Sequence, residues 1–167
     1  MTYYDSIAKG YTELHKDEQL KKIQLIKDNL ELDKNDLLLD VGCGQGAWLS
    51  IWQKYGVKSI FGIDGHYVNN LLIDEQYFLP HNLDNAFDLE SKFDLVQCLE
   101  VVEHLPKDKS RIIIESLIRH GDVVLFSAAT KGQGGDNHIN EQSYEYWRSI
   151  FSEYDYVPID FIRPIIR

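Results

Sequence analysis

The chain has 167 residues, of which 44% are hydrophobic and 12% aromatic, and its formal net charge at pH 7 is −10. This composition excludes a disordered chain and suits one globular domain with a sizeable core. The negative charge opposes non-specific binding to nucleic-acid phosphates and to anionic membranes. The sequence has two isolated cysteines, no signal-peptide pattern and no apolar run of membrane length. We therefore expect a soluble cytoplasmic protein.

Apolar residues recur at helical spacing in residues 3–32, which predicts one or two amphipathic helices ahead of a sheet. From there on, apolar runs alternate with helical patterns. The predicted strands cover residues 36–41, 57–63, 77–79, 93–99, 122–128 and 154–162. The predicted helices cover residues 45–55, 69–76, 106–119 and 140–151. Such alternation predicts an α/β fold with a doubly wound, mainly parallel sheet, in a single domain over residues 1–167.

The stretch from Leu37 to Trp48 reads Leu-Leu-Leu-Asp-Val-Gly-Cys-Gly-Gln-Gly-Ala-Trp. An apolar run followed by alternating glycines predicts a buried strand that turns sharply into a helix, whose first amides face a polar ligand. The glycine spacing differs from that of dinucleotide folds and of phosphate loops. Asp40 stands two residues before the first glycine, where a carboxylate would repel a pyrophosphate but suits a ligand with an ammonium and a sulfonium.

Residues Asp40 to Gly46 resemble motif I of the class I S-adenosylmethionine (SAM) methyltransferases. The resemblance implies a Rossmann-like fold, SAM as cofactor and S-adenosylhomocysteine as product. Asp64 ends the second predicted strand, about 20 residues after the glycines, where a carboxylate accepts hydrogen bonds from ribose hydroxyls. It also matches the second motif of the family. The cofactor-binding residues implied in this way are Asp40, Gly42, Cys43, Gly44, Gly46, Trp48, Asp64, Gly65, His66, Asn82, Leu83, Leu99 and Tyr11.

Three features bear on how closely the chain follows this family. The position that reads the adenine edge usually carries aspartate, whereas this sequence has Asn82, whose carbonyl can also accept a hydrogen bond. Tyr4 and Tyr11 either cover the cofactor, with residues 1–34 as a helical lid on an α/β core of residues 35–167, or only pack helices onto the sheet. The sequence has no counterpart of the family's last, antiparallel strand. We expect a shortened chain, a minimal sheet, or an open edge covered by a second copy or a partner.

Methyl transfer requires an aligned acceptor, exclusion of water and removal of a proton. Four histidines follow predicted strands: His66, His81, His104 and His138. Glu100, Glu103 and His104 would project from one face of a helical turn, and His138 could join them from the next loop. Carboxylates and imidazoles together suit Mg²⁺, Mn²⁺ or Zn²⁺.

The Glu-x-x-Glu-His pattern at residues 100–104 resembles ubiquinone-pathway O-methyltransferases and small-RNA ribose 2′-O-methyltransferases. That resemblance implies a metal that holds the acceptor oxygen, with Glu100, Glu103, His104 and His138 as ligands. An alternative stays open. The two glutamates would be solvated charges at a helix start, and His104 or His138 would take the proton directly.

The segment 132–147 resembles a subgroup of small bacterial methyltransferases of saccharide and secondary-metabolite pathways. This implies O-methylation of a small-molecule or carbohydrate-type acceptor. Gln133, Asn137, Asn140 and Gln142 would meet sugar hydroxyls or hold the loop, and for Asn140 we favour a cap of the next helix. Rival functions are RNA ribose 2′-O-methylation, which the net charge opposes, and a SAM-binding, non-catalytic partner subunit. An NAD-dependent oxidoreductase is disfavoured by the glycine spacing.

Overall fold

The computed structural model describes residues 16–160, 162 and 164. Its centre is a five-stranded sheet with the order β3-β2-β1-β4-β5, in which every pair of neighbours is parallel. The strands are β1 (Leu37–Val41), β2 (Ser59–Asp64), β3 (Phe78–Pro80), β4 (Leu95–Leu99) and β5 (Val124–Ser127). The predicted α/β fold with a doubly wound, parallel sheet is confirmed.

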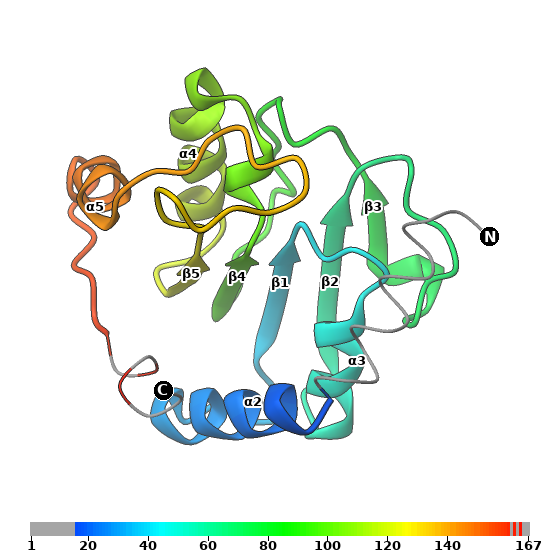
Figure 1. The fold of residues 1–167 in the computed structure, drawn as a ribbon. Helices are drawn as coiled ribbons and strands as arrows, with labels where there is room; N and C mark the ends of the chain where they lie inside the picture. Colours follow the sequence, from blue (N-terminus) through cyan, green and yellow to red (C-terminus); the bar gives the residue numbers. More distant parts are fainter. Residues whose placement is uncertain (1–15, 161, 163, 165–167) are drawn as a thin grey trace.

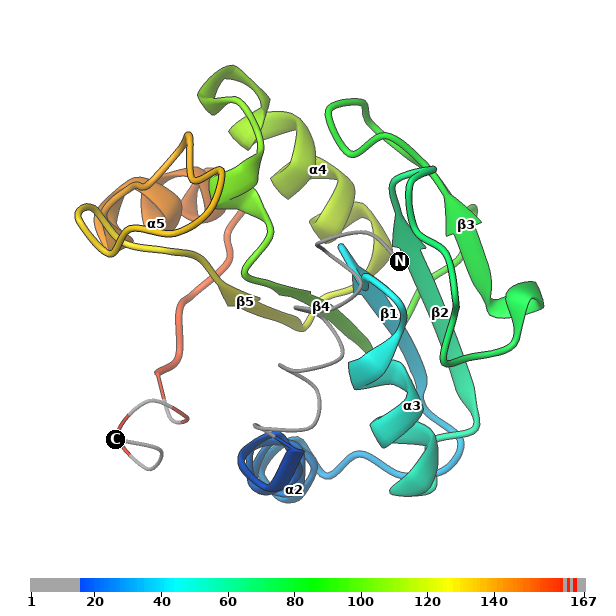
Figure 2. The ribbon, with the colours of Figure 1, turned by 45° about the vertical axis from the view of Figure 1, so that its right-hand side comes forward.

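Successive residues of β1 point to opposite faces of the sheet, so each face builds its own core. Leu39 and Val41 pack with residues of α4 (Ser110–His120) and α5 (Tyr144–Ser152). Leu38 packs on the other face with α2 (Lys16–Leu30) and α3 (Ala47–Lys54). Figures 1 and 2 show these helix pairs on the two sides of the sheet. Asp40 shares the face of Leu38 and therefore lies on the side of α3.

From β1 the chain adds β2 and β3 on one side, and then β4 and β5 on the other, so the direction of winding reverses between β1 and β4. In an open parallel sheet, ligands bind at the carboxyl ends of the strands beside such a switch point. The loops that follow β4 and β5 lie at this end of the sheet in Figure 1. The topology therefore brings residues 42–46, 64–67 and 100–105 to one edge.

The prediction of a helix over residues 69–76 is wrong. Only a short 3-10 turn, η1 (Glu75–Tyr77), forms there, and the Asp74 side chain caps it. The preceding segment is held by the rest of the fold, because the Leu72 amide donates to the Gln45 carbonyl at 2.8 Å and Ile73 packs against Gly46. Tertiary contacts override the helical pattern here.

The prediction of a strand over residues 154–162 is also wrong for the described residues up to 160, which pair with no strand. Arg111 of α4 binds the Glu153 carboxylate through two nitrogens, at 2.6 and 2.9 Å. The Tyr154 hydroxyl donates to Glu115, and the Tyr156 hydroxyl donates to the Gly121 carbonyl at 2.5 Å. These bonds attach the segment to α4. Within the described part of the chain β5 is therefore an edge of the sheet, and its residues are only half-buried.

Helix α2 buries Ile23 and Ile26 against the core beside α3. Whether an N-terminal lid covers the cofactor concerns residues 1–15, and these, with Tyr4 and Tyr11, lie outside the described residues. Among the helices of the described chain, none is both long and apolar enough to cross a membrane.

Candidate active site

The glycine turn after β1 has a left-handed backbone at Gly42 (φ 79°), Gly44 (φ 54°) and Gly46 (φ 81°). A β-carbon on Gly42 would lie 2.2 Å from a methyl group of Val101, so this glycine permits close approach of the loop after β4. A β-carbon on Gly44 would meet no atom within 4 Å. The turn is thus tightly packed at Gly42 and open to a ligand at Gly44.

The amides of these glycines are already bonded within the protein. Gly42 donates to the Ile63 carbonyl at 2.8 Å, Gly44 donates to the Asp64 carboxylate at 2.7 Å, and Gly46 donates to the Cys43 carbonyl at 2.9 Å. These three amides are therefore not free for a ligand, and the expectation that the first amides of the helix face the ligand concerns α3, which begins at Ala47, and stays a prediction. The contribution of the three glycines is the shape of the backbone.

Asp64 ends β2 and connects the glycine turn with the following loop. Its Oδ2 accepts the Gly44 amide, and its Oδ1 accepts the Gly65 amide and the Tyr67 hydroxyl, both at 2.6 Å. A carboxylate oxygen accepts about two hydrogen bonds, so Oδ1 is saturated by these donors. A ribose that binds both oxygens must displace the Tyr67 hydroxyl.

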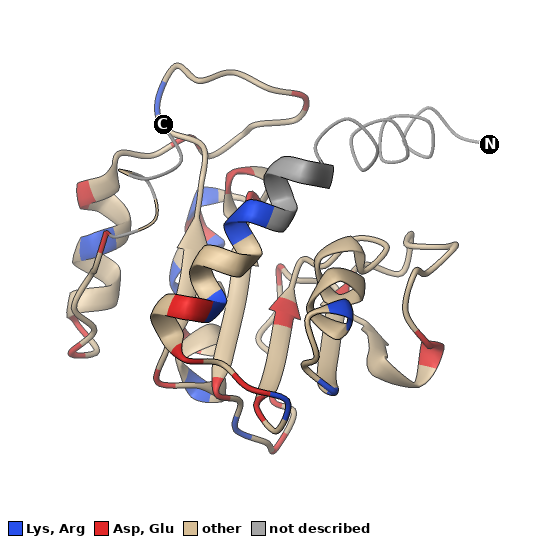
Figure 3. Ribbon diagram, turned by 90° about the horizontal axis from the view of Figure 1, so that it is seen from below, with Lys and Arg blue, Asp and Glu red and all other residues tan. Residues whose placement is uncertain are grey.

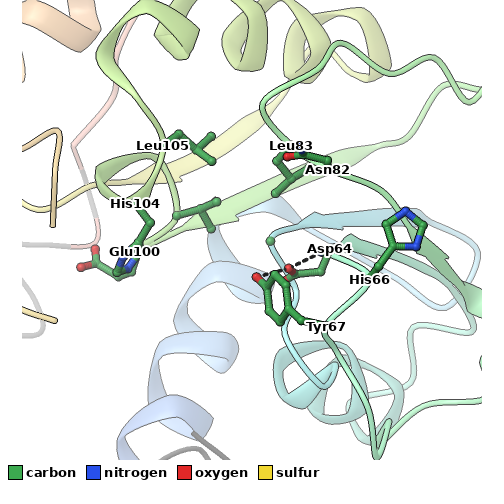
Figure 4. Close-up of a pocket in the computed structure, with 11 residues that line it drawn as sticks. Asp64, His66, Tyr67, Asn82, Leu83, Glu100, His104 and Leu105 are labelled. Atoms are coloured by element: carbon green, nitrogen blue, oxygen red, sulfur yellow. Dashed lines mark hydrogen bonds between the residues drawn. The ribbon is translucent and has the colours of Figure 1, made fainter. Parts of the chain in front are cut away.

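A cavity of about 330 Å³ opens above these residues. Figure 4 shows His66 and Tyr67 at one end of it and Glu100 and His104 at the other. Its lining residues are Gly42, Asp64, Gly65, His66, Tyr67, Asn82, Leu83, Glu100, Val101, His104 and Leu105. The structure thus brings eight of the predicted site residues together, and adds Val101, Leu105 and Tyr67, which the sequence analysis missed. Val101 lies within the predicted Glu-x-x-Glu-His pattern and Leu105 follows it, and this position in the chain was the available signal for both.

Asp40 lies below the glycine turn rather than in the cavity wall, and its side chain is buried. Burial raises the pKa of Asp40 to about 7, and the neighbouring Gln97 amide offsets only part of this effect. Gln97 is oriented by Trp52, whose indole N–H donates to Gln97 Oε1 at 3.2 Å. Among the described residues no donor pairs with Asp40 Oδ2.

At the other end of the cavity, Glu103 is completely buried and organises two loops. Its carbonyl accepts the amides of Ile139 and Asn140, and its Oε1 accepts the Ala129 amide at 3.1 Å. Glu103 Oε2 has no hydrogen-bond partner among the described residues. Burial, and then the nearby Glu100 carboxylate, raise the pKa of Glu103 against the lowering effect of its backbone contacts.

Glu103, His104 and His138 each place one ligand atom within 4.8 Å of the other two. The His104 and His138 rings meet edge to face, with centroids 4.9 Å apart. Glu100 does not belong to this group, which corrects the predicted arrangement on one helical turn. The turn is η2 (Val102–His104), a 3-10 turn, and Glu100 precedes it with a left-handed backbone (φ 55°). Its carboxylate accepts the Ser127 hydroxyl at 2.7 Å instead.

His138 is held by a residue that the sequence analysis did not select. Its Nδ1 lies 3.1 Å from Glu141 Oε1. The same carboxylate accepts the amides of Gly132 and Gly134 at 2.8 and 2.7 Å. The bond to His138, followed by the bonds to these amides, lowers the pKa of Glu141.

The remaining predicted residues of the described chain lie outside the cavity wall. Cys43 and the other cysteine, Cys98, are buried and unpaired, and burial raises the pKa of each thiol. His81 packs edge to face on Phe87. The predicted cofactor-binding residues that also lie outside the wall are Asp40, Gly44, Gly46, Trp48 and Leu99. The predicted catalytic residues outside it are Glu103 and His138.

Asn140 is not a helix cap, contrary to the prediction. Ser143 caps α5 through a bond from the Tyr146 amide, and Asn140 is buried, with its Nδ2 donating to the Val102 carbonyl and to Ser110 Oγ. Gln142 donates to Asn140, and Gln133 accepts the Thr130 amide. These amides hold the loop after β5.

Comparison with known proteins agrees with this geometry. The family described as "Methyltransferase domain" matches residues 14–160. A tRNA U34 carboxymethyltransferase of Vibrio cholerae is 28% identical over 130 residues, 71% of this chain and 40% of the relative, so the chain spans well under half of that protein. A ubiquinone biosynthesis O-methyltransferase of Neisseria meningitidis is 29% identical over 61% of this chain and 48% of its own length.

Among solved structures, magnesium protoporphyrin IX methyltransferase of Synechocystis with bound SAM has a TM-score of 0.60 at 20% identity and covers 92% of this chain and 73% of that chain. The methyltransferase domain of the bacterial protein CtHen1 has the same TM-score at 19% identity, over 83% of this chain and 85% of that chain. At such identities the likeness concerns the fold. The family match, the switch-point cavity and the pairing of Asp64 with the glycine turn together lead to one conclusion: the chain belongs to the methyltransferase domain family and has the class I fold of SAM-dependent methyltransferases.

Proposed function

We propose that this protein methylates a hydroxyl group of a small molecule and that a divalent metal bound beside the cavity assists it. The observation that carries the proposal is the group of Glu103, His104 and His138, whose ligand atoms lie within 4.8 Å of one another. His104 also lines the cavity that Asp64 enters from the opposite end. Cofactor and acceptor would therefore meet in one cavity.

The residues at the cofactor end fit SAM, which supplies an activated methyl group when it is bound. Asp64 would accept the ribose hydroxyls, and the open space above Gly44 leaves room for the methionine part. The unpartnered Oδ2 of Asp40 supports a ligand with a positive charge nearby, because a buried carboxylate oxygen without a donor is costly. Asn82 was expected to accept a hydrogen bond from the adenine edge. Its Oδ1 already accepts the Asp84 amide at 3.0 Å, so the adenine would share this oxygen with Asp84.

The residues at the other end fit a divalent metal. Glu103 Oε2 is buried and unpartnered, which a metal ligand would resolve. One carboxylate and two imidazoles are a donor set that suits Zn²⁺ or Mn²⁺, and when bound the ion would lower the pKa of the acceptor hydroxyl. We propose Glu103, His104 and His138 as its ligands, with Glu100 as a residue that could join them only after leaving Ser127.

The protein's own groups would complete the site. Val101 and Leu105 supply apolar walls that help to exclude water from the methyl group. His104 is exposed to the cavity side and His138 is partly buried, so either ring could accept the proton that the hydroxyl loses. This role of the histidines would also serve a version of the site without metal.

A small acceptor is favoured over RNA by charge. The net charge is −10, and basic and acidic residues of the described chain are interspersed in the view of Figure 3. RNA ribose 2′-O-methylation remains the second candidate because of the Glu-x-x-Glu-His pattern. Recognition of a sugar by Gln133, Asn140 and Gln142 is less well supported than expected, since these amides hold the loop.

We also propose that the β5 edge is covered by a second copy or by a partner chain. The strand is half-buried, and Val157 and Ile159, which follow α5 in the chain, are each 80% exposed. An unpaired strand edge and exposed apolar side chains both favour association. Light scattering of the purified protein tests the second copy, which a monomer at micromolar concentration would contradict; co-purification tests the partner chain.

The test of the proposed function is transfer of a labelled methyl group from SAM to a panel of catechols, sugars and short RNAs, with EDTA and with added Mn²⁺ or Zn²⁺. We expect methylation of a small hydroxyl compound that EDTA abolishes and metal restores. Activity that EDTA leaves unchanged would overturn the metal, and activity on RNA alone would overturn the acceptor class.

A further inference from the structure

Glu141 contacts His138, which belongs to the group formed with Glu103 and His104. Its Oε1 is 3.1 Å from His138 Nδ1. The side chains of His138 and Glu141 are only 13% and 19% exposed. An ionised carboxylate can only accept hydrogen bonds, so the imidazole nitrogen that faces it must carry the proton. In a neutral ring this leaves Nε2 as the nitrogen with a lone pair.

The surrounding loop leaves room beside that nitrogen because it has a glycine there. A β-carbon on Gly135 would lie 2.5 Å from His138 Nε2, so any other residue at this position would fill the space beside it. Gly132 and Gly134, in the same loop, have left-handed backbones (φ 82° and 71°). A glycine-rich loop loses much conformational entropy on folding and does not hold a side chain in place unaided.

Glu141 supplies the missing restraint. Its carboxylate accepts the amides of Gly132 and Gly134 at 2.8 and 2.7 Å as well as the His138 ring. One side chain therefore fixes both the course of the loop and the orientation of the imidazole. Glu141 itself is not part of the group of possible metal ligands in the described chain.

We infer that Glu141 is a positioning residue, which holds His138 in the tautomer protonated on Nδ1 and presents Nε2 to the metal or to the acceptor hydroxyl. The identity of the group that Nε2 binds rests on the proposed function. The tautomer of His138 does not depend on that function. A carboxylate behind a ligating histidine orients the ring and raises its basicity, and its loss typically weakens metal binding 10- to 100-fold.

The experiment is ¹⁵N–¹H NMR of the histidine rings at pH 8.5, where an unperturbed imidazole is neutral. It compares the wild type with Glu141→Ala and Glu141→Gln, and a His138→Gln spectrum assigns the signal. We expect His138 protonated on Nδ1 in the wild type, a mixture of tautomers in Glu141→Ala, and recovery of the wild-type tautomer in Glu141→Gln, which keeps an acceptor oxygen. Gln133→Ala is the control, because it removes the bond to the Thr130 amide and loosens the loop without touching His138.

Two results would overturn the inference: a wild-type His138 that carries a proton on Nε2, or a Glu141→Ala spectrum identical to the wild type. Calorimetric titration with Mn²⁺ on the same samples separates this from the proposed function. We expect a 10- to 100-fold weaker affinity in Glu141→Ala and no change in Gln133→Ala. The expected tautomers in a wild type that binds no Mn²⁺ would support the positioning role and overturn the metal.

Discussion

The two ends of the cavity are built in different ways. At the cofactor end, Asp64 and the glycine turn are neighbours because β1 and β2 pair in register, with Val41 opposite Ile63. At the acceptor end, Glu103, His104 and His138 meet through loops that no sheet register aligns. Strand pairing fixes the first end through the backbone, whereas the second depends on individual side chains.

At the acceptor end, hydrogen bonds of buried side chains hold the loops in place of strand pairing. Asn140 donates to the Val102 carbonyl and to Ser110 Oγ, and Glu103 accepts the Ala129 amide. Buried polar groups with satisfied bonds give loops a defined conformation. A change at the cofactor end should therefore act on stability and cofactor binding, and a change at the acceptor end on chemistry.

The largest effect should follow from Glu103→Gln. The amide oxygen can still accept the Ala129 amide, but the ligand atom at Oε2 becomes a donor. We expect kcat to fall at least about 100-fold, with the affinity for S-adenosylhomocysteine unchanged. Glu100→Gln is the matched control and should lose less than about fivefold, since Glu100 binds Ser127. Equal losses would restore the predicted set of four ligands.

Gly42→Ala and Gly44→Ala should separate stability from binding. Alanine at position 42 would clash with Val101 and keep a left-handed backbone, so we expect the free energy of unfolding to fall by about 3 kcal/mol. Alanine at position 44 meets open space, so only the backbone cost of about 1 kcal/mol applies, while the new methyl group obstructs the cofactor. Urea denaturation and calorimetric titration measure the two effects, and equal destabilisation would contradict this description of the turn.

Asp40 should make cofactor binding depend on pH. Its pKa in the free protein is about 7, and an ammonium-bearing ligand favours the ionised form, so affinity is lost as the pH falls through 7. We expect S-adenosylhomocysteine to bind about tenfold more weakly at pH 6 than at pH 8, and Asp40→Asn to lack this slope.

The same pKa has an opposite consequence for the stability of the free protein. Because the folded state holds the Asp40 proton more tightly than the unfolded chain, stability falls as the pH rises from about 4 to 7. Asp40→Asn should therefore raise the free energy of unfolding at pH 8 by about 4 kcal/mol at most. A destabilised Asp40→Asn at pH 8 would show that the carboxylate is not strained by burial.

The smallest effect concerns Tyr67. Its hydroxyl occupies an acceptor site on Asp64 Oδ1 that the ribose would use. Removal of the hydroxyl in Tyr67→Phe should tighten S-adenosylhomocysteine binding about threefold. Tyr156→Phe removes a hydroxyl bonded far from the cavity, to Gly121, and should leave this affinity unchanged. Weaker binding in Tyr67→Phe would mean that the phenol itself contacts the cofactor.

The predictable parts of the molecule were those with local signals. Apolar runs predicted the five strands that form, and the separation of Asp64 from the glycines along the chain indicated the ribose site. The helix over residues 69–76 and the strand over residues 154–162 failed because long-range bonds, such as Leu72 to Gln45 and Tyr156 to Gly121, decide those segments.

The acceptor end was predicted as a list of residue types but not as an arrangement. His138 was selected because it follows a strand, whereas Glu141, three residues later, carries no signal until the loop closes on it. Likewise, the left-handed backbone of Glu100, which directs its carboxylate to Ser127, cannot be read from a helical spacing.

The most direct test of the two-ended site is a paired calorimetric titration with S-adenosylhomocysteine and with Mn²⁺, on the wild type, Asp64→Asn and Glu103→Gln. We predict that the wild type binds both, that Asp64→Asn loses S-adenosylhomocysteine but keeps Mn²⁺, and that Glu103→Gln does the reverse. Loss of both ligands in either variant, with the fold intact by circular dichroism, would contradict independent construction of the two ends. A wild type that binds S-adenosylhomocysteine but no Mn²⁺ would contradict the metal at the acceptor end.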